Sequence, residues 1–117
     1  MGYSEDSSKV ISIKLQSLWG QFENLAMKEG EKVKDFFSIV TEIGNQIKSY
    51  GEEVPEKKVV EKILRSLPQK FEHVVAVIEE TKDLTKLSQY ELMGSLEAHE
   101  ERVNRYNRRL VSWTSFQ

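Results

Sequence analysis

Apolar side chains recur three or four positions apart along most of this chain, which is the spacing of one face of an α-helix. The clearest run is Ile11, Leu15, Leu18, Phe22 and Leu25. Only two prolines and six glycines interrupt the 117 residues, and no alternation of apolar and polar residues is long enough to predict a strand. The sequence therefore predicts an all-α fold, a bundle of five helices with short connections.

Local signals set the expected helix ends. Gly30 and Gly51 suit helix C-termini, because a left-handed closing residue is least strained as glycine. Pro55 suits a first helical position, and Pro68 should end the helix before it. Gly44 falls inside a helix, where we expect it to admit a close-packed neighbour. The predicted helices cover residues 8–27, 31–50, 55–67, 69–80 and 88–110.

Two further segments carry local signals about where helices form. Residues 74–78 are rich in valine and favour a strand by propensity, but we predict a helix because no strand partner lies nearby. Ser88 and Glu91 have the spacing of a capping box, in which each side chain bonds a backbone N–H of the other residue. Leu87 and Leu92 stand where a hydrophobic staple would place them, so a helix is expected to begin at this point.

The composition offers little material for catalysis. The chain has no cysteine, so it has neither disulfides nor thiolate metal ligands, which fits a reducing compartment. His73 and His99 fall on different predicted helices, and no phosphate loop or nucleophile elbow is present. We predict a protein that is not an enzyme and has no metal or cofactor. No apolar window is long enough for a membrane span, so the cytoplasm is expected, with the nucleus as alternative.

Charge argues against a dedicated nucleic-acid binder, because 17 basic residues face 19 acidic ones and the net charge is −2. The C-terminal end is nevertheless basic and aromatic. Arginines interleaved with aromatic residues can hold phosphates and stack bases, but they also suit the negative end of a helix. Weak RNA contact is therefore kept as an alternative for Arg102, Arg105, Arg108 and Arg109.

The order of several motifs resembles the Gag polyprotein of copia-type LTR retrotransposons. The most specific stretch is VVEKILRSLPQKFE at residues 59–72. It is preceded by FENL at 22–25 and MKEGE at 27–31, and followed by LMGSLEAHEER at 92–102. These motifs cover about three-quarters of the chain in the expected order.

The resemblance implies a capsid protein with two helical lobes. Residues 8–29 would be the last helix of the N-terminal lobe and 30–107 the C-terminal lobe, together one helical domain at 8–107. Residues 1–7 are expected to be a flexible N-terminus and 108–117 a basic, aromatic tail. Most of the N-terminal lobe and the Cys/His zinc knuckle are absent, which suggests one isolated lobe or a Gag fragment retained by a host.

Two apolar patches are predicted to bind protein. On the third helix, Val60 and Leu64 lie on a minor face flanked by Lys57 and Glu61, where a copy could pair by two-fold symmetry; the alternative is that both are core. On the first helix, the stripe that would rest on the missing lobe must fold back, pair with another chain or stay exposed. Its residues are Ile11, Leu15, Trp19 and Phe22.

The leading functional hypothesis is a self-association module that forms homodimers or capsid-type assemblies. A domesticated fragment that binds full-length Gag or a host protein, and thereby caps or inhibits capsid assembly, is the second hypothesis. Weak RNA binding is the third. No membrane partner is expected.

Overall fold

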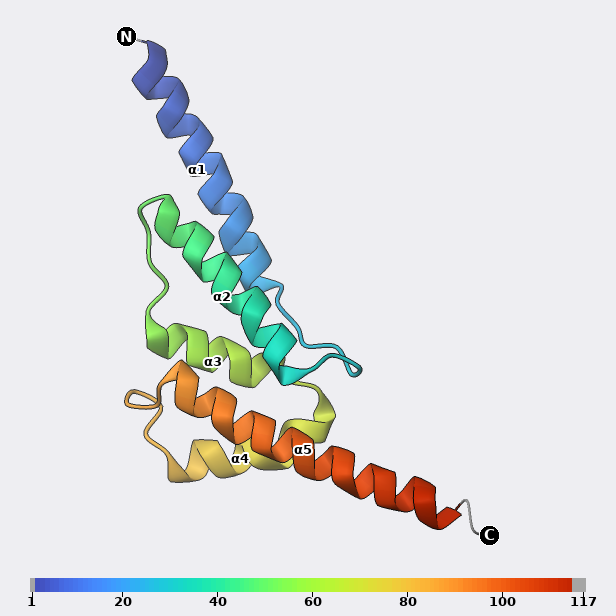
Figure 1. The fold of residues 1–117 in the computed structure, drawn as a ribbon. Helices are drawn as coiled ribbons and strands as arrows, with labels where there is room; N and C mark the ends of the chain where they lie inside the picture. The colour runs from blue at the N-terminus through green and yellow to red at the C-terminus, as the bar shows by residue number, and fades with distance from the viewer. Residues whose placement is uncertain (1, 115–117) are drawn as a thin grey trace.

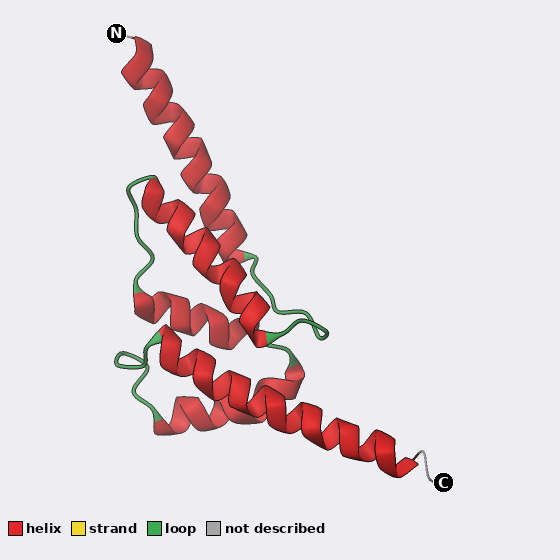
Figure 2. Cartoon of the chain, in the orientation of Figure 1, coloured by secondary structure: helices red, strands yellow, loops and turns green. Residues whose placement is uncertain are grey.

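The computed structural model describes residues 2–114, with side chains described from 7 to 112. Within this range the chain is helical, as predicted, and the segment at 74–78 is helix rather than strand (Figures 1 and 2). The elements are α1 (Gly2–Glu23), α2 (Val33–Ser49), α3 (Glu56–Ser66), the 3-10 turn η1 (Gln69–Phe71), α4 (Glu72–Thr81) and α5 (Gln89–Thr114).

The two longest helices project from opposite ends of the molecule. The C-terminal part of α1 lies along α2, α3 lies across the middle, and α5 runs below α3 and beyond it (Figure 1). The radius of gyration is 18.6 Å, whereas a compact domain of this length would have about 13 Å. The excess comes from the projecting halves of α1 and α5.

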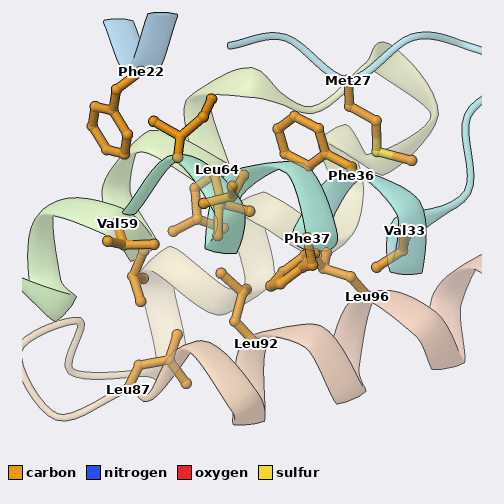
Figure 3. Close-up of a cluster of buried hydrophobic side chains, with 14 of the residues drawn as sticks. Phe22, Met27, Val33, Phe36, Phe37, Val59, Leu64, Leu87, Leu92 and Leu96 are labelled. Carbon is orange, nitrogen blue, oxygen red and sulfur yellow. The ribbon is translucent and has the colours of Figure 1, made fainter. Parts of the chain in front are cut away.

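Every helix contributes to one hydrophobic core (Figure 3). Phe22 enters it from α1, Phe36 from α2, Leu64 from α3 and Leu92 from α5. Phe71 of η1 is completely buried and packs against the His99 ring, at 5.6 Å between ring centroids. The core holds the covered parts of the helices together. It thereby also fixes the direction in which the uncovered halves of α1 and α5 project.

The predicted helix stops are correct at Gly51 and Pro68 and wrong at Gly30. Gly51 follows α2 with a φ of +96°, the left-handed backbone that favours glycine. Leu67 is extended before Pro68, and α3 ends there. Gly30 does not end α1, which stops at Glu23. A Cβ at Gly44 would meet no described atom within 4 Å, so the close neighbour expected there is wrong.

The start of α5 confirms the predicted capping box. The Glu91 backbone N–H donates to Ser88 Oγ at 3.0 Å, and the Ser88 N–H donates to Glu91 Oε1 at 3.4 Å. Leu87 and Leu92 are both buried at this end, as a hydrophobic staple requires. The sequence therefore located this helix start correctly.

Two capping contacts join segments that are far apart in the sequence. Lys32, the N-cap residue of α2, has no side-chain oxygen for the first-turn amides. Glu100 of α5 supplies one, and its Oε2 accepts from the Val33 N–H at 2.9 Å. Glu56 at the start of α3 accepts from the Gln89 N–H of α5 at 2.8 Å. These contacts tie α5 to both α2 and α3.

The projecting helices extend further than predicted. The first begins at Gly2 rather than residue 8, and α5 continues to Thr114 rather than residue 110. Neither extension contains a proline or a glycine that would break it, apart from Gly2 at the very start. The predicted flexible residues 1–7 and the predicted tail 108–117 lie partly outside the described residues, which exclude Met1 and 115–117.

Candidate interaction surfaces

Trp19 is used within the chain to hold α1 in place. Its indole N–H donates to Glu52 Oε1 at 2.7 Å, in the loop after α2. The Lys58 ammonium of α3 lies 4.9 Å from the ring centroid, and Phe22 meets the ring edge-on at 5.8 Å. A half-buried ring with three intramolecular contacts is an anchor for α1, which differs from the protein-binding role predicted for it.

The segment between α1 and α2 is fastened to α3 and η1. The Lys62 ammonium donates to the Glu23 carbonyl at 2.5 Å, where a positive charge suits the negative end of α1. The Met27 N–H donates to the Ser66 carbonyl at 2.9 Å, which takes this residue out of the predicted first helix. Lys70 donates to the Glu29 carbonyl at 2.8 Å. The base of α1 is thereby held against the core.

The N-terminal half of α1 is the exposed part of that helix. Val10 is 52% exposed, Ile11 39% and Ile13 57%. Of the predicted α1 patch, Ile11 alone is exposed, because Leu15 and Trp19 are half-buried against the core and Phe22 is 1% exposed. The exposed apolar surface therefore lies nearer the N-terminus than predicted and includes Val10 and Ile13.

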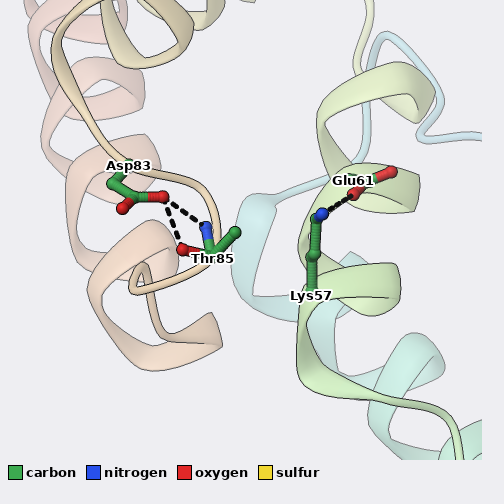
Figure 4. Close-up of polar contacts among 4 residues, drawn as sticks. All are labelled: Lys57, Glu61, Asp83 and Thr85. Carbon is green, nitrogen blue, oxygen red and sulfur yellow. Dashed lines mark hydrogen bonds and ion pairs between the residues drawn. The ribbon is translucent and has the colours of Figure 1, made fainter.

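The predicted patch on α3 is wrong. Val60 is 0% exposed and Leu64 5%, so the single chain already covers both. After Pro68 the chain turns back, and Leu64 shares a hollow with Leu67 and with Val75 of α4. The predicted flanking residues remain on the surface, where Lys57 and Glu61 form an ion pair at 3.9 Å (Figure 4). The second face of α3 is therefore core, the alternative left open by the sequence.

The loop before α5 is ordered by its own polar groups (Figure 4). Asp83 Oδ1 accepts from the Thr85 hydroxyl at 2.6 Å and from the Thr85 N–H at 3.0 Å. These two hydrogen bonds, with a smaller contribution from the charge of Lys57, hold the pKa of Asp83 below its ordinary value. The carboxylate acts as a turn-forming group on the surface.

Three of the four predicted arginines share one face of α5. Arg102, Arg105 and Arg109 line a shallow hollow together with Tyr106, while Arg108 lies outside it. Arg105 also pairs with Glu101 at 3.6 Å. The face therefore combines positive charge with one exposed aromatic ring.

The sequence reading missed a broad groove between α2 and the start of α5. Its volume is about 1050 Å³. Phe37 and Met93 provide apolar lining, and Tyr90 stands 81% exposed beside it. Polar residues line the α2 side, among them the charged Lys34 and Glu42. The helical spacing of the uncharged ones was a signal in the sequence: Ser38, Thr41, Asn45 and Ser49.

Among the described residues, no three histidine, aspartate or glutamate side chains lie together as they would at a metal site. None of the helices in this range is both long and apolar enough to cross a bilayer.

The chain matches a known protein family over most of its length. The sequence model of a protein family described as gag-polypeptide of LTR copia-type matches residues 6–109, which include all of α2 to α4 and most of α1 and α5. No curated protein and no solved structure matched the chain.

Proposed function

The chain belongs to the gag-polypeptide family of copia-type LTR elements, and on that premise we propose that it is a non-enzymatic structural module that associates with copies of itself. Gag is a structural protein family. A structural module needs a body that keeps its shape and a surface that can meet another body. The shared core supplies the first requirement.

One observation supports self-association, namely the exposed apolar side chains on the projecting half of α1. Val10 and Ile13 lie three residues apart and so share one face of the helix, while Ile11 lies about 100° around from Val10. The base of this helix is fixed by Trp19 and Lys62. Contiguous apolar patches on soluble monomers are limited in size, and larger ones mark interaction sites. A rigid helix presenting such a patch loses little conformational entropy when it binds.

The proposed partner is a second copy, because two-fold pairing is the commonest closed arrangement of identical chains. In such a pair Val10 and Ile13 form the shared apolar face, and Ile11, the exposed residue of the predicted set, lies beside Val10 and roughly opposite Ile13 on the helix. Lys57 and Glu61 stay outside it, since their predicted apolar centre of Val60 and Leu64 is covered.

The mass in solution tests the proposal. Weak interfaces are populated at about 100 μM. At this concentration, light scattering on a sizing column should give a mass above the 13.6 kDa of one chain. Ile13→Glu should lower that mass, because it places a charge in the apolar patch. Val77→Glu is the matched control, since Val77 is 43% exposed on α4, away from the patch.

A mass of one chain at this concentration would rule out the proposal.

If the chain does associate, electron microscopy of the associated material distinguishes two forms of the function. Ordered shells indicate capsid-type assembly. Discrete dimers that stop another capsid protein from assembling indicate a capping role.

Weak contact with single-stranded RNA is a second candidate, favoured by the face that Arg102, Arg105, Tyr106 and Arg109 share. Its test is affinity for an unstructured RNA at several salt concentrations. Arg105→Ala and Arg109→Ala should each weaken binding and reduce its salt dependence. Affinity unchanged by both substitutions would exclude this face as an RNA site.

A further inference from the structure

The apolar stripe of α5 continues past the core without losing its spacing. Its positions alternate between four and three residues apart, the heptad spacing of helices that pack along one another. The stripe runs through Leu92, Leu96, His99, Val103, Tyr106 and Leu110.

Burial changes abruptly along this stripe. Leu92 and Leu96 are 0% exposed, whereas Tyr106 is 62% and Leu110 44% exposed. The change follows His99 and Glu100, which contact η1 and the start of α2. Every described side chain from residue 104 to 112 is exposed. The first half of the stripe is therefore covered by the chain itself, and the second half projects.

We propose that the projecting seam of Val103, Tyr106 and Leu110 pairs with the same seam of a second copy, as a short parallel coiled coil. This inference rests on the proposed self-association and names an additional surface for it. The spacing favours a helix as the partner, because a second helix with the same repeat can contact every one of these alternating positions.

The flanking charges determine the direction of the pair. With Val103 and Leu110 at positions a and Tyr106 at d, both g positions are arginine, Arg102 and Arg109. A parallel pair sets Arg102 of one chain beside the uncharged Asn107 at the partner's e position. An antiparallel pair sets g beside g, and so arginine beside arginine, which is repulsive. The parallel arrangement avoids this repulsion.

A second copy accounts for more of this surface than a polyanion does. Arg102, Arg105 and Arg109 lie to one side of the seam. A nucleic acid held by them would leave Leu110 uncovered and Val103 half-buried, as it is in the single chain. Pairing of two seams covers the apolar residues and leaves the arginines at the edge of the contact. Their charged groups stay in water there, so the pairing has no desolvation cost for them.

The pairing should be weak by itself, because the seam is far shorter than the three to four heptads of a stable coiled coil. It adds to association through α1 by joining a different copy, so the two contacts do not raise each other's effective concentration. The projecting halves lie at opposite ends of the molecule (Figure 1). A copy bound at each end therefore gives an extended array rather than a closed dimer.

Single cysteines test both the contact and its direction, and the absence of native cysteine makes each one the sole thiol. Under mild oxidation at about 100 μM, Leu110→Cys should form a disulfide dimer several-fold faster than Val111→Cys. Val111 is the matched control, because it is the neighbouring apolar residue, is 68% exposed and lies about 100° around the helix. Equal rates for the two variants would overturn the proposal.

The antiparallel alternative gives a different pattern. There position a faces the partner's d, so Leu110→Cys alone would remain uncrosslinked. A mixture of Val103→Cys and Tyr106→Cys would instead form the mixed disulfide. That result would overturn the parallel arrangement.

A second measurement separates this proposal from the proposed function. Leu110→Glu should weaken self-association several-fold in sedimentation equilibrium while circular dichroism keeps the helical signal. If Leu110→Glu associates like the unaltered chain and Leu110→Cys does not cross-link, the seam is wrong and self-association through α1 stands. If the unaltered chain is monomeric and no variant cross-links, both proposals fail. If Leu110→Glu lowers only RNA affinity, the occupant is RNA and the seam proposal is overturned.

Discussion

The third and fifth helices are both amphipathic, and the fold treats them in opposite ways. The third is short, and its two apolar faces are both covered, with Val59 and Ile63 on one and Val60 and Leu64 on the other. The fifth is 26 residues long and is covered for only its first half, up to Glu100. An apolar helix face therefore needs a neighbour to cover it. The position of the helix in the bundle decides whether that neighbour is another segment of the same chain.

This contrast also assigns different roles to the two helices. The middle helix stabilises the body, because α4 and α5 close over it. The ends of α1 and α5 extend beyond the last element that could cover them. Surfaces for other molecules are therefore expected at the ends of the long helices. The contrast with α3 can be measured as a difference in how substitutions change the free energy of unfolding.

The largest effect is expected on α3. Leu64→Ala should lower the free energy of unfolding by about 2–5 kcal/mol, because it leaves a cavity in the core. Denaturant titration measures this, with Val77→Ala on the exposed side of α4 as control. A loss below about 0.5 kcal/mol, the usual range for surface positions, would mean that Leu64 is a surface residue after all and would remove the contrast.

The next effect marks the boundary within α5. Glu100→Ala should cost about 1 kcal/mol, the typical value for losing an N-terminal cap, because Val33 loses its acceptor. Glu101→Ala removes only the exposed pair with Arg105 and should cost about 0.3 kcal/mol. Thermal unfolding of both variants tests this difference. Equal losses would show that the packed half of α5 does not end where the cap places it.

The projecting half should contribute little to the stability of one chain. Leu110→Ala should change the free energy of unfolding by less than about 0.5 kcal/mol, since the residue lies outside the core. Denaturation in dilute solution, where copies are separate, measures this value. A loss comparable to that of Leu64→Ala would mean that the chain covers this seam itself.

The smallest effect concerns the loop that brings α5 alongside α3. Thr85→Val removes the hydroxyl donor to Asp83 and should raise the pKa of Asp83 toward its ordinary value. A carboxyl group whose pKa is lowered by folding stabilises the fold above its unfolded-state pKa, and this contribution is lost as the pH falls through the folded-state pKa. The destabilisation by Thr85→Val should therefore be present at pH 7 and disappear in acid. NMR titration of Asp83 is the direct measurement, and an unchanged pKa would contradict the assignment.

Some predictions from the sequence were correct because their causes are local. The capping box of Ser88 and Glu91 lies within four residues, and the stop at Pro68 acts on the residue beside it. The helical stripes follow from the spacing of side chains along one segment. Family membership was also read from the sequence, through motifs that run in order along it.

Other features could not be predicted because their causes lie far apart in the sequence. Trp19 is anchored by Glu52 and Lys58, which meet it from more than 30 residues away. The groove beside Tyr90 requires two helices that only the fold brings together. The cap that Glu100 gives to Val33 spans 67 residues and has no local signal.

The amino-acid sequence alone determined that this protein is helical, where several helices begin and end, and which side of each is apolar. Only the tertiary structure decided that Val60 and Leu64 are inside while Ile13 and Leu110 are outside. The physical reason is that helix periodicity arises between neighbours in the chain, whereas burial depends on which distant segment lies over a face.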